Sequence, residues 1–176
     1  DPYPSFQGDL KKGPFDSEQA VLAAMDEAGR LTVENQLVDS YFGNISCYID
    51  DVVHISQTGS SLDELAGMID PCPLDGSSCA GLTASSELSA HSEVYLKTDA
   101  RTILHGHPRF SVIMSMLCDH TDCGQRETCF QSCPQERWLG DDILSGIPIV
   151  PGEVGTGPFG LVNTMPAAMQ GRASVM

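Results

Sequence analysis

The chain has 176 residues, enough for one domain with a substantial core and too few for a second full domain. Hydrophobic residues make up 41% and charged residues 19%, which is typical of a folded protein and excludes disorder for most of the chain. The formal charge of −15 would repel the phosphate backbone of a nucleic acid. Since no apolar run reaches the roughly 18 residues of a membrane helix, we expect no nucleic-acid or membrane partner. Residues 1–15 also lack the pattern of a signal peptide, which favours a cytoplasmic protein.

The number of cysteines also bears on the compartment. Seven cysteines cannot all pair within one chain, which favours a reducing environment. Four of them share the segment 118–133 with His120: Cys118, Cys123, Cys129 and Cys133. This cysteine-rich insertion leaves three alternatives open, namely a second metal site with zinc or an iron–sulfur cluster, one or two disulfides, or free thiols.

The chain begins with a predicted arm followed by a helix. Residues 1–15 hold three prolines and two glycines, which favours an extended arm. A helix is expected from Glu18 to about Leu31, because apolar side chains recur there at helical spacing and Asp16 or Ser17 can cap its start. The apolar face consists of Val21, Leu22, Met25, Ala28 and Gly29.

A β-hairpin is predicted next. The segments 45–49 and 52–56 are short and rich in β-branched residues, and Asp50 with Asp51 joins them. Two polar loops are then expected, over 57–61 and over 70–83, because both stretches are rich in residues that favour turns.

The remaining pattern alternates helices and strands. A helix that Ser85 or Ser86 caps and that Lys97 and Thr98 close is expected next, followed by a strand over 102–107. Further along the chain we expect a helix over 110–117, a strand over 147–150 and a glycine-rich loop over 152–160. This alternation predicts a layered α/β fold.

The sharpest chemical signal is the segment His105-Gly106-His107-Pro108. Side chains two apart on a strand project from the same face, so two imidazoles converge while Gly106 leaves the opposite face open. Neutral imidazole is a common ligand of zinc and similar divalent ions. The alternative is a pair of surface histidines at the end of a strand.

Glu87 opens the helix that leads into this strand, and its carboxylate could reach a metal or a substrate. The alternative is a carboxylate that interacts with the helix dipole. His91 follows one helical turn later, and a half-buried histidine paired with Glu87 is favoured over a further metal ligand.

Three short segments could cradle an anion: Gly43-Asn44, Thr58-Gly59 and Ser85-Ser86. Each offers backbone N–H groups from a turn or a helix start, together with a small polar side chain. In so acidic a protein, a phosphorylated substrate would need such donors and a cation. As separate motifs, the three segments are also ordinary turn and cap sequences.

Taken together and in order, these motifs resemble the class II aldolase/adducin family, the zinc-dependent, fuculose-phosphate aldolase-like proteins. Residues 43–46 look like the family's GN-[IVL]-S turn, and 55–59 resemble its hydrophobic-T-P-[ST]-G loop, with Gln57 in place of proline. Residues 85–87 match its SSE segment and 105–108 its H-x-H-P segment. Four motifs in the same order are far more specific than any one alone.

The resemblance implies a three-layer fold, with a mixed, largely antiparallel sheet between helix layers, and a homotetramer with active sites between subunits. It implies that His105 and His107 bind Zn²⁺, or Mn²⁺, Fe²⁺ or Co²⁺ in its place, and that Glu87 coordinates the ion and acts as acid/base. The residues that would hold the phosphate are Gly43, Asn44, Thr58, Gly59, Ser85 and Ser86.

The family takes a third metal histidine from beyond residue 176, and no histidine follows His120 here. We therefore interpret 16–176 as the family domain without its C-terminal part; substitution by His120 or a cysteine, or an incomplete site, are the alternatives. The function implied is a lyase that cleaves a ketose 1-phosphate to dihydroxyacetone phosphate and an aldehyde through a metal-stabilised enediolate. The alternatives are a pentulose-phosphate 4-epimerase, a methylthioribulose-phosphate dehydratase, or a non-catalytic adducin-like assembly domain.

Overall fold

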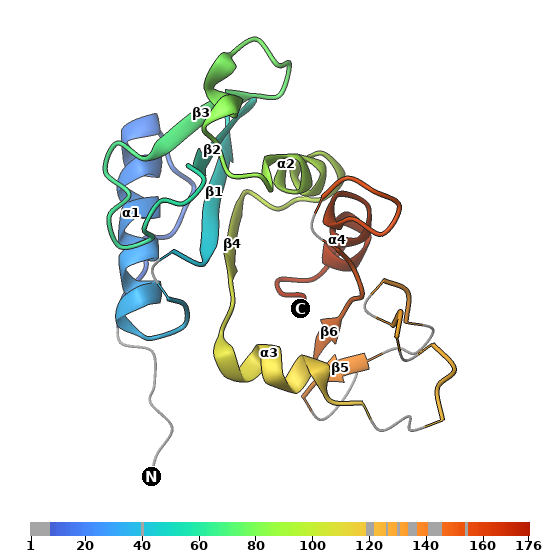
Figure 1. Ribbon diagram of the computed structural model, residues 1–176. Helices are drawn as coiled ribbons and strands as arrows, with labels where there is room; N and C mark the ends of the chain where they lie inside the picture. Colours follow the sequence, from blue (N-terminus) through green and yellow to red (C-terminus); the bar gives the residue numbers. More distant parts are fainter. Residues whose placement is uncertain are drawn as a thin grey trace. The chain divides into compact units, whose positions relative to one another are not determined.

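The computed structural model describes residues 8–39, 41–118, 122–125, 127–129, 131–133, 137–140, 146–153 and 155–176. These residues form two compact units. The first comprises the described part of Asp1–Ser85 together with Arg101–Arg109, and the second comprises Ser86–Ala100 together with the described part of Phe110–Met176. Figure 1 shows the elements of both units. None of the described helices is long and apolar enough to span a membrane.

The first unit is built on a four-stranded sheet. Its strands are β1 (Gly43–Ile49), β2 (Val52–Ser56), β3 (Ile69–Pro73) and β4 (Thr102–Gly106), in the order β3-β2-β1-β4. Every neighbouring pair is antiparallel, which agrees with the predicted class of sheet. A short 3-10 helix, η1 (Cys79–Leu82), follows β3.

The predicted hairpin is confirmed. β1 and β2 pair directly, and the two residues between them have φ angles of 50° at Asp50 and 61° at Asp51. Two successive positive φ angles are those of a type I′ turn, which matches the twist of antiparallel strands. The Tyr48 hydroxyl donates a hydrogen bond of 2.7 Å to the Asp51 carboxylate and fastens the turn to β1.

The loop predicted over 70–83 is wrong at its beginning, where β3 lies. Pro71 and Pro73 look like strand breakers, yet they occupy an edge strand, where a missing N–H is tolerated. The bonds at either end of β3 explain the arrangement: Gln57 N donates to Met68 O, and Leu74 N donates to Asp51 O. The backbone N–H and C=O groups of even-numbered residues therefore point toward β2. Those of odd-numbered residues, where the prolines lie, point away from the sheet.

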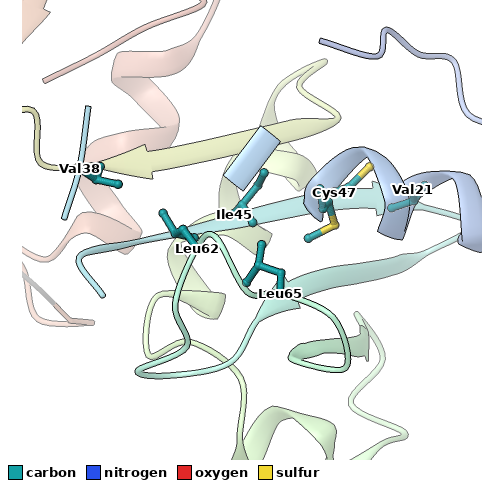
Figure 2. Close-up of a cluster of buried hydrophobic side chains, with 7 residues drawn as sticks. Val21, Val38, Ile45, Cys47, Leu62 and Leu65 are labelled. Atoms are coloured by element: carbon teal, nitrogen blue, oxygen red, sulfur yellow. The ribbon is translucent and has the colours of Figure 1, made fainter. Parts of the chain in front are cut away.

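The predicted first helix is confirmed as α1 (Glu18–Glu34), one turn longer than expected. The Ser17 hydroxyl caps it by accepting a hydrogen bond of 3.3 Å from Ala20 N. Figure 1 shows α1 lying along one face of the sheet. The buried core between them, seen in Figure 2, consists of Val21, Met25, Val38, Ile45, Cys47, Leu62 and Leu65.

Gly29 allows α1 to approach the segment after β2 closely. A Cβ atom at Gly29 would collide with the backbone carbonyl oxygen of Leu62 and come within 2.9 Å of a Leu65 methyl group. Glycine is therefore required here by space, although it is a poor helix former.

The same face of the sheet carries a buried histidine. His54 in β2 is 4% exposed and stands opposite Cys47 in the register of the hairpin. Its Nδ1 lies 3.8 Å from a carboxylate oxygen of Glu18 at the start of α1. Burial lowers the pKa of His54 below its ordinary value, and the Glu18 charge opposes that shift in part.

In the second unit, the predicted helix is confirmed as α2 (Leu88–Lys97), which has another cap and begins later than the Ser85 or Ser86 cap implies. Its N-cap residue is Glu87 rather than Ser85 or Ser86, and no side-chain hydrogen bond caps the helix. The predicted buried face is confirmed for His91, Val94 and Tyr95, all of which are buried.

The rest of the second unit holds two helices and a two-stranded sheet. The bounds are α3 (Arg109–Met116), β5 (Arg137–Leu139), β6 (Ile147–Ile149) and α4 (Leu161–Met169). β5 and β6 are antiparallel, and α4 packs against α2, as Figure 1 shows. The helix and the strand predicted over 110–117 and 147–150 correspond to α3 and β6, whereas β5 and α4 were not predicted.

Candidate metal and phosphate site

The antiparallel order of the sheet brings distant motifs to one edge. β1 begins where β2 and β4 end, so residues 43–44, 58–59 and 105–107 all lie at the same end of the sheet of the first unit. Three motifs that are far apart in the sequence are thereby neighbours in space.

The two imidazoles of the H-x-H segment meet at this edge. The Nε2 atoms of His105 and His107 are 3.2 Å apart, and the ring centroids are 4.9 Å apart. Two nitrogens bound to one tetrahedral zinc, at about 2.0–2.1 Å from the ion, lie about 3.3 Å from each other. The pair therefore fits two ligands of one divalent ion, and in the metal-free protein one ring can donate a hydrogen bond to the other.

Asn44 supports one of the two rings. Its buried side-chain amide nitrogen lies 3.4 Å from Nδ1 of His105. The amide nitrogen and oxygen exchange places when the amide is turned over, so the ring tautomer decides which of them faces Nδ1. With the amide oxygen facing a protonated Nδ1, the lone pair of Nε2 is available to a metal.

Gly43 is needed where β1 passes β4. Its φ angle is +130°, a conformation that side chains rarely adopt, and a Cβ atom would collide with the backbone oxygen of His105. Gly43 thus allows β1 to start close beside the backbone of His105; the phosphate contact that the resemblance implies for Gly43 stays a prediction.

The surroundings of the histidine pair differ from the sequence prediction in one respect. Gly106 does not leave the opposite face open, because a Cβ atom there would collide with a methyl group of Val38. On the exposed side, the ring of Phe42 lies 6.3 Å from that of His107 and is 57% exposed. Neither contact is foreseeable from spacing alone, because both residues come from the segment that precedes β1.

The Thr58-Gly59 and Ser85 segments are held side by side by hydrogen bonds. Thr58 N donates to Thr83 O at 3.0 Å, the Thr58 hydroxyl donates to Ala84 O at 2.9 Å, and Ser85 N donates to Ser56 O at 3.0 Å. Gly59 has a φ angle of +74° and open space around its Cα, so the turn presents backbone to solvent. Within the first unit, the Thr58-Gly59 segment therefore lies beside the segment that ends at Ser85.

Sequence reasoning missed a carboxylate at this surface. Asp70 of β3 is 8% exposed and accepts hydrogen bonds from Gln57 Nε2 at 2.8 Å and from the Thr83 hydroxyl at 2.6 Å. No local pattern reveals this role, because both donors lie 13 residues away from Asp70 in the sequence.

Ser86, Glu87 and His91 belong to the second unit. Ser86 is exposed, and Glu87 precedes α2. A carboxylate oxygen of Glu87 lies 4.0 Å from Nε2 of His91, which is the predicted pairing, although His91 is fully buried rather than half-buried.

The cysteine-rich insertion shows no cross-link in the part of the chain that the structure describes. No disulfide joins Cys118, Cys123, Cys129 and Cys133, and no three His, Cys, Asp or Glu side chains within the described ranges gather in a way that could hold a metal. His120 lies outside the described residues. A second metal site here stays a prediction.

Comparison with known proteins extends the resemblance. Residues 23–171 match the family model of the class II aldolase and adducin N-terminal domain. No curated protein matches the chain. Among solved structures, YgbL of Klebsiella pneumoniae, a candidate aldolase/epimerase/decarboxylase, is 27% identical, with a TM-score of 0.53 over 58% of this chain and 51% of that one.

Two further structures are similar over more of the chain. L-fuculose-1-phosphate aldolase of Thermus thermophilus has a TM-score of 0.61 at 22% identity, covering 86% of this chain and 71% of that one. YgbL of Escherichia coli has a TM-score of 0.64 at 17% identity, covering 87% and 72%. The match to the first YgbL structure thus spans about half of that relative's length. The family model covers most of the sequence, and the chain therefore belongs to the class II aldolase and adducin family.

Proposed function

We propose that this chain belongs to a metal-dependent lyase that cleaves a ketose 1-phosphate to dihydroxyacetone phosphate and an aldehyde. Members of the family are typically enzymes, generally depend on a divalent metal, and generally bind sugar phosphates and form oligomers. The observation that supports the proposal most is the 3.2 Å separation of the two Nε2 atoms, beside turns that suit an anion.

In this proposal His105 and His107 hold the cation, for which zinc is the first choice and Mn²⁺, Fe²⁺ and Co²⁺ are alternatives. When bound, the cation supplies a Lewis acid for the electron pair that is left when the carbon–carbon bond breaks. Glu87 moves protons to and from the reacting atoms, a role that rests on its place in the SSE segment.

The proposed phosphate contacts are divided between backbone and side chains. Thr58 and Gly59 present a turn, and Ser85 lies beside it through the bond between Ser85 N and Ser56 O. Asn44 lies at the same end of the sheet and Ser86 follows Ser85 in the chain, so each can add a polar side chain. Backbone N–H groups in such a turn bind phosphate without requiring a net positive surface.

We also propose a cytoplasmic homotetramer. Its support is the family resemblance together with the odd number of cysteines, which suits a reducing compartment. Sedimentation of the purified protein measures the oligomer directly, and a monomer at micromolar concentration would contradict this part of the proposal.

The test of the reaction is product analysis with the zinc-loaded protein and a panel of ketose 1-phosphates. The proposal expects dihydroxyacetone phosphate, and expects its loss in His107→Ala but not in Leu104→Ala, a truncation of a neighbouring strand residue. Epimerised or dehydrated sugars in its place would establish the alternative chemistries. Zinc binding that is unchanged in His105→Ala, with no turnover, would favour an assembly domain.

A further inference from the structure

Gln57 occupies the position where the family loop usually has proline, and it makes two bonds that proline cannot make. Its backbone N–H donates to Met68 O at 2.9 Å, and its side-chain Nε2 donates to Asp70 Oδ1 at 2.8 Å. Proline has no N–H and no amide. The turn that contains Thr58 and Gly59 is therefore held by hydrogen bonds to edge strand β3. In the usual family loop, the ring of a proline would restrict the backbone at this position.

Asp70 extends this fastening to the neighbouring segment. Its second carboxylate oxygen accepts a hydrogen bond of 2.6 Å from the Thr83 hydroxyl, and Thr83 O in turn accepts from Thr58 N at 3.0 Å. One buried carboxylate thus connects the segment after β2 with the segment that leads to Ser85. Hydrogen bonds to an ionised group are roughly twice as strong as neutral ones.

Each carboxylate oxygen of Asp70 accepts a hydrogen bond in the structure, so Asp70 offers no donor to an anion. Any effect that it has on an anion must act through the two donors that it holds, Gln57 and Thr83. Because the Thr58 hydroxyl also donates to Ala84 O at 2.9 Å, a shift of either segment would move the other.

We propose that Asp70, with Gln57 and Thr83, is a positioning residue that sets the spacing of the two phosphate-binding segments. This inference rests on the proposed function, in which Thr58, Gly59 and Ser85 contact the phosphate group of the substrate. We call the three side chains of Asp70, Gln57 and Thr83 the clamp. Because none of them belongs to the histidine pair, changes to the clamp should alter phosphate binding and leave metal binding unchanged.

The test exchanges the two partners of the clamp and measures the dissociation constant for inorganic phosphate by calorimetry. Gln57→Glu sets a second carboxylate against Asp70 and should weaken phosphate binding about tenfold, since a charged hydrogen bond is lost. Adding Asp70→Asn should restore binding to within about twofold, because the new amide donates to the new carboxylate while its oxygen still accepts from Thr83.

Two controls separate positioning from general loss of structure. Asp75→Asn makes the same chemical change just after β3, where the carboxylate accepts from Ser77 N at 2.9 Å, and should leave phosphate binding unchanged. The zinc affinity of each variant should also stay unchanged, which a collapse of the sheet edge would not allow. If Gln57→Glu does not fold, Thr83→Val removes one hydroxyl and should weaken phosphate binding about threefold.

The outcomes distinguish the two proposals. Absence of phosphate binding by the unaltered protein would overturn the phosphate site, and the clamp with it. If the unaltered protein binds phosphate and Gln57→Glu binds it equally well, the clamp alone would be overturned. The same holds if Gln57→Glu weakens binding and adding Asp70→Asn does not restore it. Weakening followed by restoration, with constant zinc affinity, would support both.

Discussion

The two faces of β1 are built for different purposes. Ile45 and Cys47 face α1 and belong to the apolar core. Asn44 lies on the same strand but points to the opposite face of the sheet, where its side chain approaches His105. Side chains of a strand alternate between faces, so one seven-residue strand serves both. The comparison predicts that changes to the core and changes to the proposed metal site can be separated, although the residues concerned are neighbours in β1.

The largest expected effect falls on the α1 face. Met25 is 3% exposed within the core, so Met25→Ala should lower the free energy of unfolding by about 2–5 kcal/mol. Zinc affinity at temperatures where the variant is folded should stay within about twofold. Urea denaturation measures the first quantity and calorimetry the second, and a matching loss of zinc binding would break the separation of the faces.

Gly29→Ala tests the packing on the α1 face through its effect on the free energy of unfolding. An exposed helical site would gain up to about 1 kcal/mol from this change. Here the added methyl group meets the Leu62 carbonyl, and overpacking should cost about 1–3 kcal/mol. Chemical denaturation gives the sign directly, and a stabilised variant would show that α1 does not approach Leu62 as closely as described.

On the opposite face of the sheet, Asn44→Ala should weaken metal binding. Loss of a partner beside a metal-ligating histidine typically costs on the order of 10-fold to 100-fold in metal affinity, and the lower value is expected for a contact of 3.4 Å. Ser46→Ala, two residues along on the same face and fully buried, is the matched control and should keep full zinc affinity. Equal effects of the two variants would contradict a specific role for Asn44.

The smallest effect concerns pH. The pKa of His54 in the folded protein lies below the value of 6.5 expected after unfolding, so between these values the unfolded chain binds the proton and the folded chain does not. Stability should therefore decline as pH falls from about 7.5 through 6.5 toward the lower pKa. His54→Gln should flatten this part of the stability curve of the metal-free protein, whereas an unchanged slope would show that other groups cause it.

The parts that could be predicted from the sequence are those that local patterns decide. Ser17 as a cap and Asp50-Asp51 as a two-residue turn depend on nearby residues only, and both are confirmed. β3 was predicted as a loop because Pro71 and Pro73 are breakers in any strand except one at an edge. Whether a strand lies at an edge depends on the whole sheet.

The candidate site divides in the same way. That His105 and His107 share one side follows from strand periodicity, and the approach of their rings agrees with it. The roles of Asp70 and Val38 depend on segments far away in the sequence, so no local pattern could reveal them. The roles of Glu87 and of the cysteine-rich insertion stay predictions.

The central claim is that His105 and His107 bind one divalent ion through their Nε2 atoms. Crystals of the zinc-loaded protein, measured on both sides of the zinc absorption edge, would locate the ion without assumptions about its ligands. The account predicts one anomalous peak at about 2.0–2.1 Å from both Nε2 atoms. Zinc found only among the cysteines, or rings that stay in direct contact with no ion between them, would contradict it.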